Sequence, residues 1–190
     1  MTITHSDFFV YFCHNRFEFM STKGTLILNK EQILQKSKRI AYQILEDNFD
    51  ETHIVLVGIA DRGYVFAQRF QKLLQEFTTD KEIELIKVFI NKEKRSLEAT
   101  TDQPIEIAKN KVVIVVDDVL NSGRTLAYAL GTFINVPLKK MRTAVLIDRS
   151  HTKFPIHSDF YGQKLSTILK ENVKVYLKEI DNQEDAAWLV

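Results

Sequence analysis

Two adjacent acidic residues and the short polar turn after them are the part of this sequence best suited to chemistry. Asp117 and Asp118 end the apolar run 112–116, and Asn-Ser-Gly-Arg-Thr follows at 121–125. Hydroxyl groups, a glycine and the first N–H groups of a following helix suit a phosphate group. Carboxylates beside a phosphate would repel it, so we expect them to accept hydrogen bonds from sugar hydroxyls and to help hold Mg²⁺. The segment predicts a site for a phosphorylated sugar.

The acidic pair by itself leaves other interpretations open. Two aspartates after a strand also occur in solvated turns and in acidic sites like those of response regulators. The β-branched run 112–116 predicts a buried strand. In an open α/β sheet, ligands bind at the carboxyl ends of the strands. The combination of strand, acidic pair and glycine-containing turn therefore favours the phosphorylated sugar.

The elements that must position this turn alternate along the chain. Helical spacing of apolar residues predicts helices at 30–48, 65–77 and 125–134. Runs of apolar and β-branched residues predict strands at 54–58, 83–90, 112–116, 143–147 and 173–177. Segment 91–109 is polar, contains Pro104 and is expected to be a long loop. The alternation predicts an α/β fold with a mainly parallel sheet and helices on both faces.

The bulk composition excludes several other classes of protein. The chain has 190 residues, which suits one domain with one sizeable core. Its formal net charge of +1 gives no overall attraction to nucleic acid or to an anionic membrane. No apolar run reaches the roughly 18 residues that a membrane span needs. The single cysteine, Cys13, allows no intramolecular disulfide, and a cytoplasmic location is expected.

The N-terminus carries an apolar cluster at 8–12 that follows Asp7. It has neither the basic region nor the cleavage site of a signal peptide. Two interpretations remain. The cluster is an aromatic arm that packs on the domain or on a second subunit, or residues 1–19 are an N-terminal extension outside the ancestral fold, with Met20 as the start. We favour the second, so that the folded domain comprises residues 20–190.

Segment 117–125 resembles the phosphoribosyl pyrophosphate motif of type I phosphoribosyltransferases, in which two acidic residues and a spacer precede Thr/Ser-Gly-x-Thr. Segments 37–46, 56–63 and 145–162 resemble the first helix, the pyrophosphate loop and the C-terminal signature of the bifunctional pyrimidine-operon attenuation regulators with uracil phosphoribosyltransferase activity. The resemblance covers most of the chain after residue 19. It implies that 20–190 is a phosphoribosyltransferase domain of the type I fold, a mainly parallel central sheet flanked by helices with a small hood.

The resemblance also implies a reaction. A ring nitrogen of a nucleobase, most readily uracil, displaces pyrophosphate from the ribose carbon and yields a nucleoside 5′-monophosphate. The partners are phosphoribosyl pyrophosphate, the base and Mg²⁺, and a homo-oligomer is expected. Asp117 and Asp118 would bind the ribose hydroxyls, help hold the metal and, with Arg62, carry catalysis. The turn would bind the rest of phosphoribosyl pyrophosphate through Asn121, Ser122, Gly123, Arg124 and Thr125.

Two further groups of residues take roles from the resemblance. Asp61, Arg62 and Gly63 would grip the pyrophosphate, with a cis peptide expected between Asp61 and Arg62. The alternative for Arg62 is that it simply starts a surface helix. The base would lie against Arg149, Tyr161 and Ile168. An aromatic residue at 161 is equally typical of core packing.

The sequence departs from the family in ways that bear on the base. Segment 89–94 lacks the usual Tyr-Arg-Asp-Asp, although Lys92, Lys94 and Arg95 remain available to meet pyrophosphate. Asn121 stands where purine-specific relatives have an aspartate, and asparagine takes no proton at neutral pH. This argues against a standard hypoxanthine-guanine enzyme, which stays as an alternative.

A nucleotide-sensing, RNA-binding attenuation regulator with weak or no catalysis is the other alternative. The basic residues Lys38 and Arg39 of the first helix remain, but Tyr42 and Asp47 replace a histidine and an arginine that are common in the regulators. A carboxylate on a surface that faces phosphates is unfavourable. The sequence therefore favours the enzyme over the RNA-binding regulator.

Overall fold

The structure is a computed structural model of the chain, and it describes residues 24–91, 98–166 and 171–190. The proposed extension 1–19 and the base-binding candidate Ile168 therefore lie outside the described residues, as do Lys92, Lys94 and Arg95.

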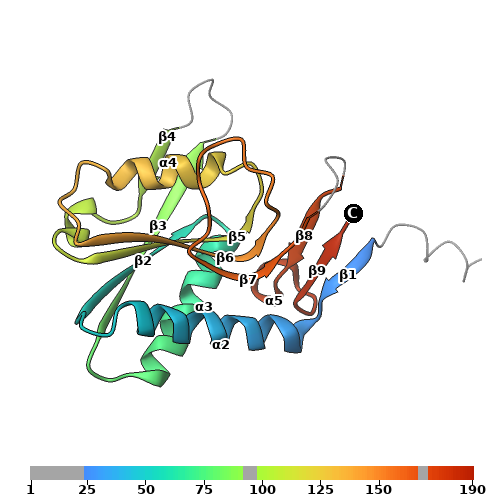
Figure 1. Cartoon of the computed structure of the whole chain (residues 1–190), viewed down its shortest axis with the longest axis horizontal. Coiled ribbons are helices and arrows are strands. Elements are labelled where there is room, and N and C mark those ends of the chain that lie inside the picture. The colour runs from blue at the N-terminus through green and yellow to red at the C-terminus, as the bar shows by residue number, and fades with distance from the viewer. Residues whose placement is uncertain (1–23, 92–97, 167–170) are drawn as a thin grey trace, which may run out of the picture.

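A six-stranded sheet forms the centre of the molecule (Figure 1). Its strands, in spatial order, are β4 (Glu98–Thr101), β3 (Glu82–Asn91), β2 (His53–Ile59), β5 (Val112–Leu120), β6 (Lys140–Asp148) and β7 (Phe160–Lys164). All neighbouring pairs are parallel except β3 and β4. The expected mainly parallel α/β sheet is confirmed, and β5 lies inside it between β2 and β6 because its first five residues are fully buried on both faces.

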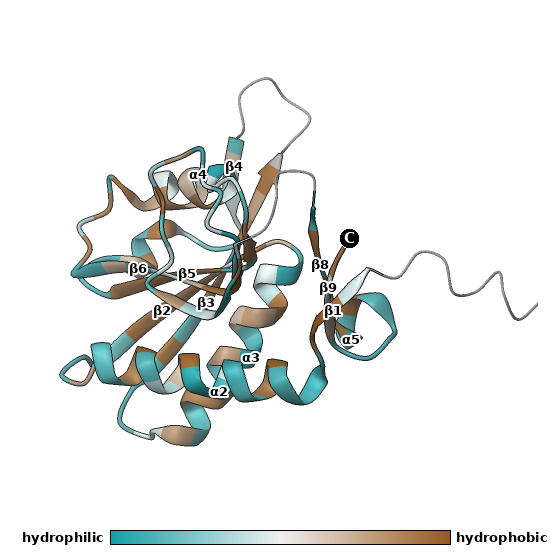
Figure 2. Ribbon diagram, turned by 45° about the vertical axis from the view of Figure 1, so that its right-hand side comes forward, coloured by the Kyte–Doolittle hydropathy of each residue, from teal (hydrophilic) through white to brown (hydrophobic). Residues whose placement is uncertain are grey.

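Helices cover both faces of this sheet (Figure 1). The helices α2 (Lys30–Asp47) and α3 (Arg62–Phe77) pack on one face, and α4 (Arg124–Phe133) packs on the other. The apolar residues of α2 recur on its inner side, and its outer side is hydrophilic (Figure 2). Asn29 and Gln32 form a capping box at its start. Each face of the sheet thus has a hydrophobic cluster of its own.

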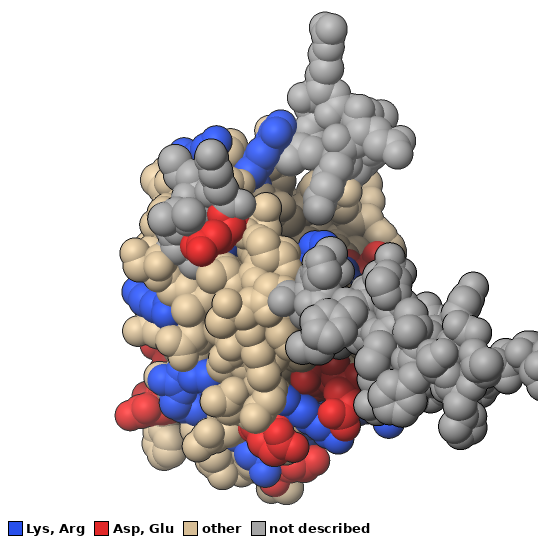
Figure 3. All heavy atoms as spheres, turned by 90° about the vertical axis from the view of Figure 1, so that its right-hand side faces the viewer, with Lys and Arg blue, Asp and Glu red and all other residues tan. Residues whose placement is uncertain are grey.

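A second, antiparallel sheet forms a small hood beside the carboxyl ends of the parallel strands (Figure 1). It comprises β1 (Thr25–Leu28), β9 (Ala186–Leu189) and β8 (Val173–Tyr176), with the short helix α5 (Lys178–Asp181) between β8 and β9. Arg69 of α3 clamps the hood, because its guanidinium binds Asp185 and Glu179 at 2.6 Å each. Acidic and basic side chains mix on the lower part of the face that carries the hood (Figure 3).

The expected loop at 91–109 is wrong in part, because the described residues of this segment contain β4 and a 3₁₀ helix at Ile105–Ala108. β4 is an edge strand with alternating exposed positions, and backbone pairing with β3 holds it. Such a strand shows little hydrophobic pattern in the sequence. The short strands β1, β7 and β9 also went unpredicted, and each has only four or five residues.

Candidate functional site

The acidic pair lies within the last part of β5, where burial gives way to partial exposure. Asp117 Oδ1 accepts the N–H of Asp118 at 2.9 Å, and Asp118 Oδ1 accepts the N–H of Val119 at 2.8 Å. These bonds hold both side chains at the carboxyl edge of the sheet. Burial raises the pKa of Asp118, although hydrogen bonds from Asp117 and Val119 and the charge of Arg62 act in the opposite direction. The surroundings of the Asp118 carboxyl group therefore act in both directions: burial disfavours its ionised form, and the hydrogen bonds and Arg62 favour it.

Gly63 brings the predicted pyrophosphate loop against this acidic pair. A Cβ atom at Gly63 would lie 2.6 Å from the carbonyl oxygen of Val116 and 2.9 Å from Cα of Asp117. Real Cβ atoms do not approach a backbone so closely, so only glycine lets the start of α3 reach the end of β5. The close approach joins two segments of the expected site that lie more than fifty positions apart in the sequence.

The cis peptide bond was expected one residue too late. It joins Ala60 to Asp61, not Asp61 to Arg62. Asp61 has helical backbone angles as the N-terminal cap of α3, and Arg62 is the first residue of the helix. The cis bond therefore precedes Asp61, and the peptide bond between Asp61 and Arg62 already belongs to the start of α3.

Arg62 both begins α3, as the alternative interpretation held, and ties that helix to the hood. Its Nε donates to the carbonyl oxygen of Val175 at 2.8 Å, and its Nη2 donates to Asp181 Oδ1 at 2.7 Å. Asp181 is in turn fixed, because its Oδ2 accepts the N–H of Leu177 at 2.8 Å. The guanidinium lies close enough to Asp118 to affect its pKa. A pyrophosphate-binding role for Arg62 stays a prediction.

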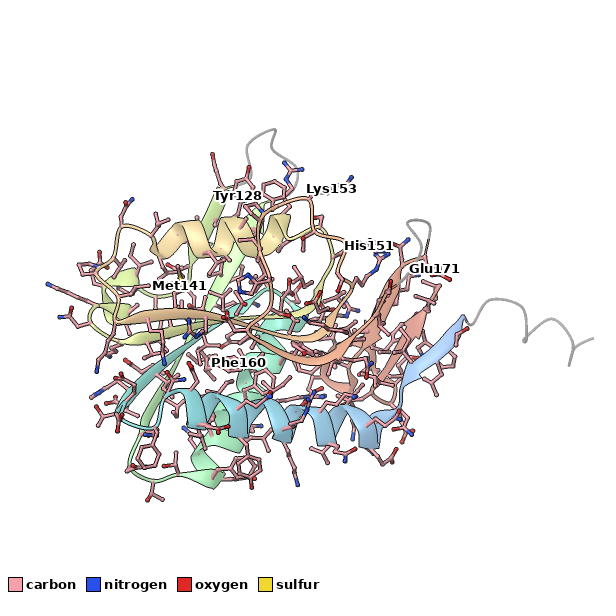
Figure 4. All side chains as sticks on the ribbon, viewed as in Figure 1. Tyr128, Met141, His151, Lys153, Phe160 and Glu171 are labelled. Carbon is pink, nitrogen blue, oxygen red and sulfur yellow. The ribbon has the colours of Figure 1, made fainter. Side chains whose placement is uncertain are left out.

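The turn after β5 has the backbone expected of a phosphate loop. Gly123 adopts a left-handed conformation with φ of 77° and caps the N-terminus of α4. The carbonyl oxygen of Ser122 accepts the N–H groups of Lys153 and Phe154 at 2.8 and 3.1 Å, which ties the turn to the loop after β6. Figure 4 places Lys153 on the α4 side of the sheet. Arg124 is exposed and Thr125 is half-buried at the start of α4.

Arg149, a base-binding candidate, contacts Asn121 of this turn. Arg149 is 3% exposed, and its Nη1 donates to Asn121 Oδ1 at 2.9 Å. Its backbone N–H donates to the carbonyl oxygen of Leu120 at 3.0 Å, and its Nη2 donates to the carbonyl oxygen of Glu171. Glu171 and His151 lie toward the hood in Figure 4. The buried guanidinium therefore joins the ends of β5 and β6 to the segment before β8.

Tyr161 lies in β7 opposite Val145 of β6, three residues before the end of that strand. It packs on the hydrophobic cluster beneath α4, and the ammonium group of Lys164 lies 4.5 Å from the centre of its ring. This location agrees with the core-packing alternative, and base binding by Tyr161 stays a prediction.

Polar residues of the C-terminal signature hold the sheet edge together. Asp148 is 4% exposed and accepts hydrogen bonds from the N–H of Ser150 and the hydroxyl of Ser158, at 2.8 and 2.7 Å. Asp159 accepts the N–H and the hydroxyl of Thr143 at 2.8 and 2.9 Å. The acidic and hydroxyl residues of the signature therefore stabilise β6 and β7 through these hydrogen bonds.

Lys87 is a charged residue of this region that the sequence interpretation missed. Its Nζ lies 3.4 Å from Asp61 Oδ1, and 5.1 and 5.0 Å from the ring centres of Tyr64 and Phe89. Lys87 pairs with Gly58 in the sheet, close to the carboxyl end of β2. The signal in the sequence is a lysine near the end of an otherwise largely apolar strand, and it is too common to identify a site.

The two carboxylates of the site suit a metal ion that takes its remaining ligands from substrate and water. No group of three or more His, Cys, Asp or Glu residues in the described part of the chain is arranged to hold a metal. Asp117 and Asp118 supply carboxylate oxygens, and Mg²⁺ commonly binds through one or two carboxylates plus water and substrate phosphates. None of the described helices combines the length and the apolar composition that a membrane crossing requires.

Comparison with known proteins identifies the family. A model of the phosphoribosyl transferase domain matches residues 24–180. The bifunctional protein PyrR of Fusobacterium nucleatum is 36% identical over 177 residues, which cover 90% of this chain and 100% of that protein. The bifunctional protein PyrR of Clostridium acetobutylicum is 37% identical over 166 residues, which cover 83% of this chain and 93% of that protein.

A solved structure shares the fold. The crystal structure of a hypoxanthine-guanine phosphoribosyltransferase from Bacillus anthracis matches with a TM-score of 0.70 at 21% identity, and the match covers 88% of this chain and 98% of that one. The type I phosphoribosyltransferase fold expected from the sequence is thereby confirmed. The chain belongs to the phosphoribosyltransferase family, and the bifunctional PyrR proteins are among its relatives.

Proposed function

We propose that this protein transfers phosphoribose from phosphoribosyl pyrophosphate to a nucleobase, with uracil as the base, and releases pyrophosphate and a nucleoside 5′-monophosphate. The observation that carries the proposal is the meeting of three features at the carboxyl edge of the sheet. These are the acidic pair of β5, the left-handed glycine that opens α4, and the start of α3 packed against Asp117 through Gly63.

The sugar and its 5′-phosphate bind along β5 and α4. Asp117 and Asp118 accept hydrogen bonds from the two ribose hydroxyls. A carboxyl group must be ionised for both of its oxygens to act only as acceptors. The 5′-phosphate lies over Gly123, where the N–H groups and positive dipole end of α4 favour an anion. Ser122 and Thr125 add hydroxyl donors, and the exposed Arg124 adds charge.

Mg²⁺ would be held by Asp117 and Asp118 together with oxygen atoms of the substrate and water. When bound, it neutralises the charge that develops on the departing pyrophosphate. The chain itself contributes position and charge: the sugar is held in line for attack, and the carboxylates face the positive charge that builds on the ribose ring.

The contact between Arg149 and Asn121 supports a base with an oxo group. A guanidinium only donates hydrogen bonds, so the atom of Asn121 that faces Arg149 is the carbonyl oxygen. The amide NH₂ then points away from Arg149, on an exposed side chain. It is suited to donate to an exocyclic oxo group such as those of uracil. Asparagine cannot take up a proton there at neutral pH, which disfavours a mechanism that needs a base beside a purine.

A second candidate function is that of an RNA-binding regulator, because the relatives carry the name bifunctional protein PyrR. The contacts of Arg39 and of Asp47 disfavour it. Arg39 Nη2 donates to the carbonyl oxygens of Tyr161 and Gly162, at 2.9 and 2.7 Å, so this cation is engaged within the fold. Asp47, which replaces a basic residue of the regulators, is paired with Lys140 and Arg142.

A panel of bases tests the proposal directly. Purified protein is mixed with phosphoribosyl pyrophosphate, Mg²⁺ and one base at a time, and pyrophosphate release is measured. Turnover with uracil is expected. Turnover with hypoxanthine or guanine instead would support the purine alternative. Absence of turnover with every base, combined with RNA binding that weakens as salt rises, would support the regulator.

A further inference from the structure

Lys87 and Arg62 are two cations beside the predicted pyrophosphate loop, and their partners differ. Arg62 is paired with Asp181, whose side chain is 15% exposed, and also donates to a backbone oxygen of the hood. Lys87 is paired with Asp61, whose side chain is 76% exposed. The charge of Arg62 is thus balanced within the protein, whereas that of Lys87 is balanced by a carboxylate in water.

The contacts of Lys87 hold its ammonium group in place without using up its donors. The centres of the Tyr64 and Phe89 rings lie 5.1 and 5.0 Å from Nζ, and both rings attract a cation at that distance. The hydrogen bond to Asp61 Oδ1 is long, at 3.4 Å. Among the described residues, Asp61 is the one carboxylate in contact with this ammonium group. An ion pair with so exposed a partner contributes little, so a doubly charged phosphate group can displace Asp61.

We propose that Lys87 binds the pyrophosphate group of phosphoribosyl pyrophosphate, while Arg62 chiefly holds the hood against α3. The inference rests on the proposed function and assigns a residue to it that the family motifs do not contain. In the sheet Lys87 lies opposite Gly58 and projects on the α3 side, where Tyr64 packs. It therefore serves the pyrophosphate end of the site, and the turn at Gly123 serves the 5′-phosphate end.

The first test compares binding of two probes by calorimetry, inorganic pyrophosphate with Mg²⁺ and ribose 5-phosphate. Lys87→Met removes the charge and keeps an unbranched side chain beside the two rings. We expect pyrophosphate affinity to fall roughly tenfold to hundredfold, and ribose 5-phosphate affinity to stay within about twofold. Lys87→Arg is expected to restore most of the pyrophosphate affinity. In the base assay, the KM for phosphoribosyl pyrophosphate should rise while the KM for the base does not.

Lys81→Met is the matched control. Lys81 precedes the other end of β3, and its ammonium group also faces an aromatic ring, 6.0 Å from the centre of Phe49. It lies at the amino edge of the sheet, away from the proposed site. Its replacement removes the same charge from the chain and should leave both affinities unchanged. An equal loss of pyrophosphate affinity in this variant would show that the Lys87 substitution acts only through the net charge of the protein, and it would overturn the proposal.

A second measurement needs no variant. Lysine amines of the wild-type protein are labelled with acetic anhydride, and the modification of Lys87 and Lys81 is followed by mass spectrometry. Pyrophosphate with Mg²⁺ should protect Lys87 and leave Lys81 unaffected, and ribose 5-phosphate should protect neither.

The outcomes separate this inference from the proposed function. Wild-type protein that binds neither phosphoribosyl pyrophosphate nor pyrophosphate contradicts both. Wild-type protein that binds and turns over substrate, while Lys87→Met keeps its pyrophosphate affinity or Lys87 is not protected, contradicts the role of Lys87 alone.

Discussion

The proposed ribose-phosphate end of the site and its proposed pyrophosphate end are held together in different ways. At the ribose-phosphate end, β5, the turn and α4 follow one another along the chain, and each carboxylate of the acidic pair accepts the backbone N–H of the next residue. At the pyrophosphate end, the start of α3 depends on Asp181 of the hood and Lys87 of β3. The first end is therefore specified locally, and the second exists only when distant elements are in place.

Replacing both acidic residues should have the largest effect, because it removes the proposed contacts to the ribose hydroxyls and the carboxylates proposed to hold Mg²⁺. In Asp117→Asn/Asp118→Asn, the amide oxygens can still accept the two backbone hydrogen bonds, so the fold should persist. Affinity for phosphoribosyl pyrophosphate should fall by about 3–6 kcal/mol if two charge-assisted hydrogen bonds are lost additively. Calorimetry measures the affinity and circular dichroism checks the fold. Full activity of the double variant would contradict the roles assigned to both residues.

Gly63→Ala tests the contact by which the two ends meet. The added methyl group would lie 2.6 Å from the carbonyl oxygen of Val116, so the start of α3 must move away from β5. We expect a loss of about 1–3 kcal/mol in the free energy of unfolding, together with weaker substrate binding. Urea denaturation measures the first.

Gly131→Ala is the control for that substitution, because nothing lies within 4 Å of its added methyl group. It sits inside α4, where alanine should stabilise the protein by about 0.5–1 kcal/mol. Equal effects of the two alanines would show that backbone flexibility, and not the close approach at Gly63, decides the outcome.

Asp181→Asn weakens the tie between α3 and the hood. It removes the charge that faces Arg62 and keeps a side-chain oxygen for the N–H of Leu177. Because Arg62 is partly exposed, we expect only about 1–2 kcal/mol of destabilisation in urea. Pyrophosphate affinity should change little if Lys87 is the binding cation. A large loss of pyrophosphate affinity without a loss of stability would instead make Arg62 the main ligand.

The smallest effect concerns pH. Burial raises the pKa of Asp118 above that of an ordinary aspartate, so substrate binding should weaken at a higher pH than usual as the solution is made more acidic. A raised folded-state pKa stabilises the fold below the unfolded pKa, and this contribution is lost as the pH rises through the folded value. Protonation of Asp118 on acidification should therefore weaken substrate binding while it favours the folded state. Asp118→Asn should remove this acidic limb from the calorimetric affinity, and an unchanged limb would assign it to another group.

The difference between the two ends also explains which parts of the molecule were predictable. The helices α2 and α4 and the strand β5 lie within a few residues of the expected positions, because their apolar periodicity is continuous. The edge strand β4 and the hood strands β1 and β9 escaped prediction, because backbone pairing with distant partners makes them strands. The partners of Arg62 and Lys87 could not be predicted from the sequence either, because they too lie far away along the chain.

The amino-acid sequence by itself determined the fold class, the glycine turn before α4 and the acidic pair, since a buried β-branched strand, a left-handed glycine and a helix start are local properties of the chain. Only the tertiary structure decided that Arg62 binds Asp181, that Arg149 faces Asn121 and that Lys87 stands beside Asp61. Which opposite charge a side chain meets depends on how the strands and the hood are placed. The spacing of two residues in the sequence does not give the distance between their side chains in the fold.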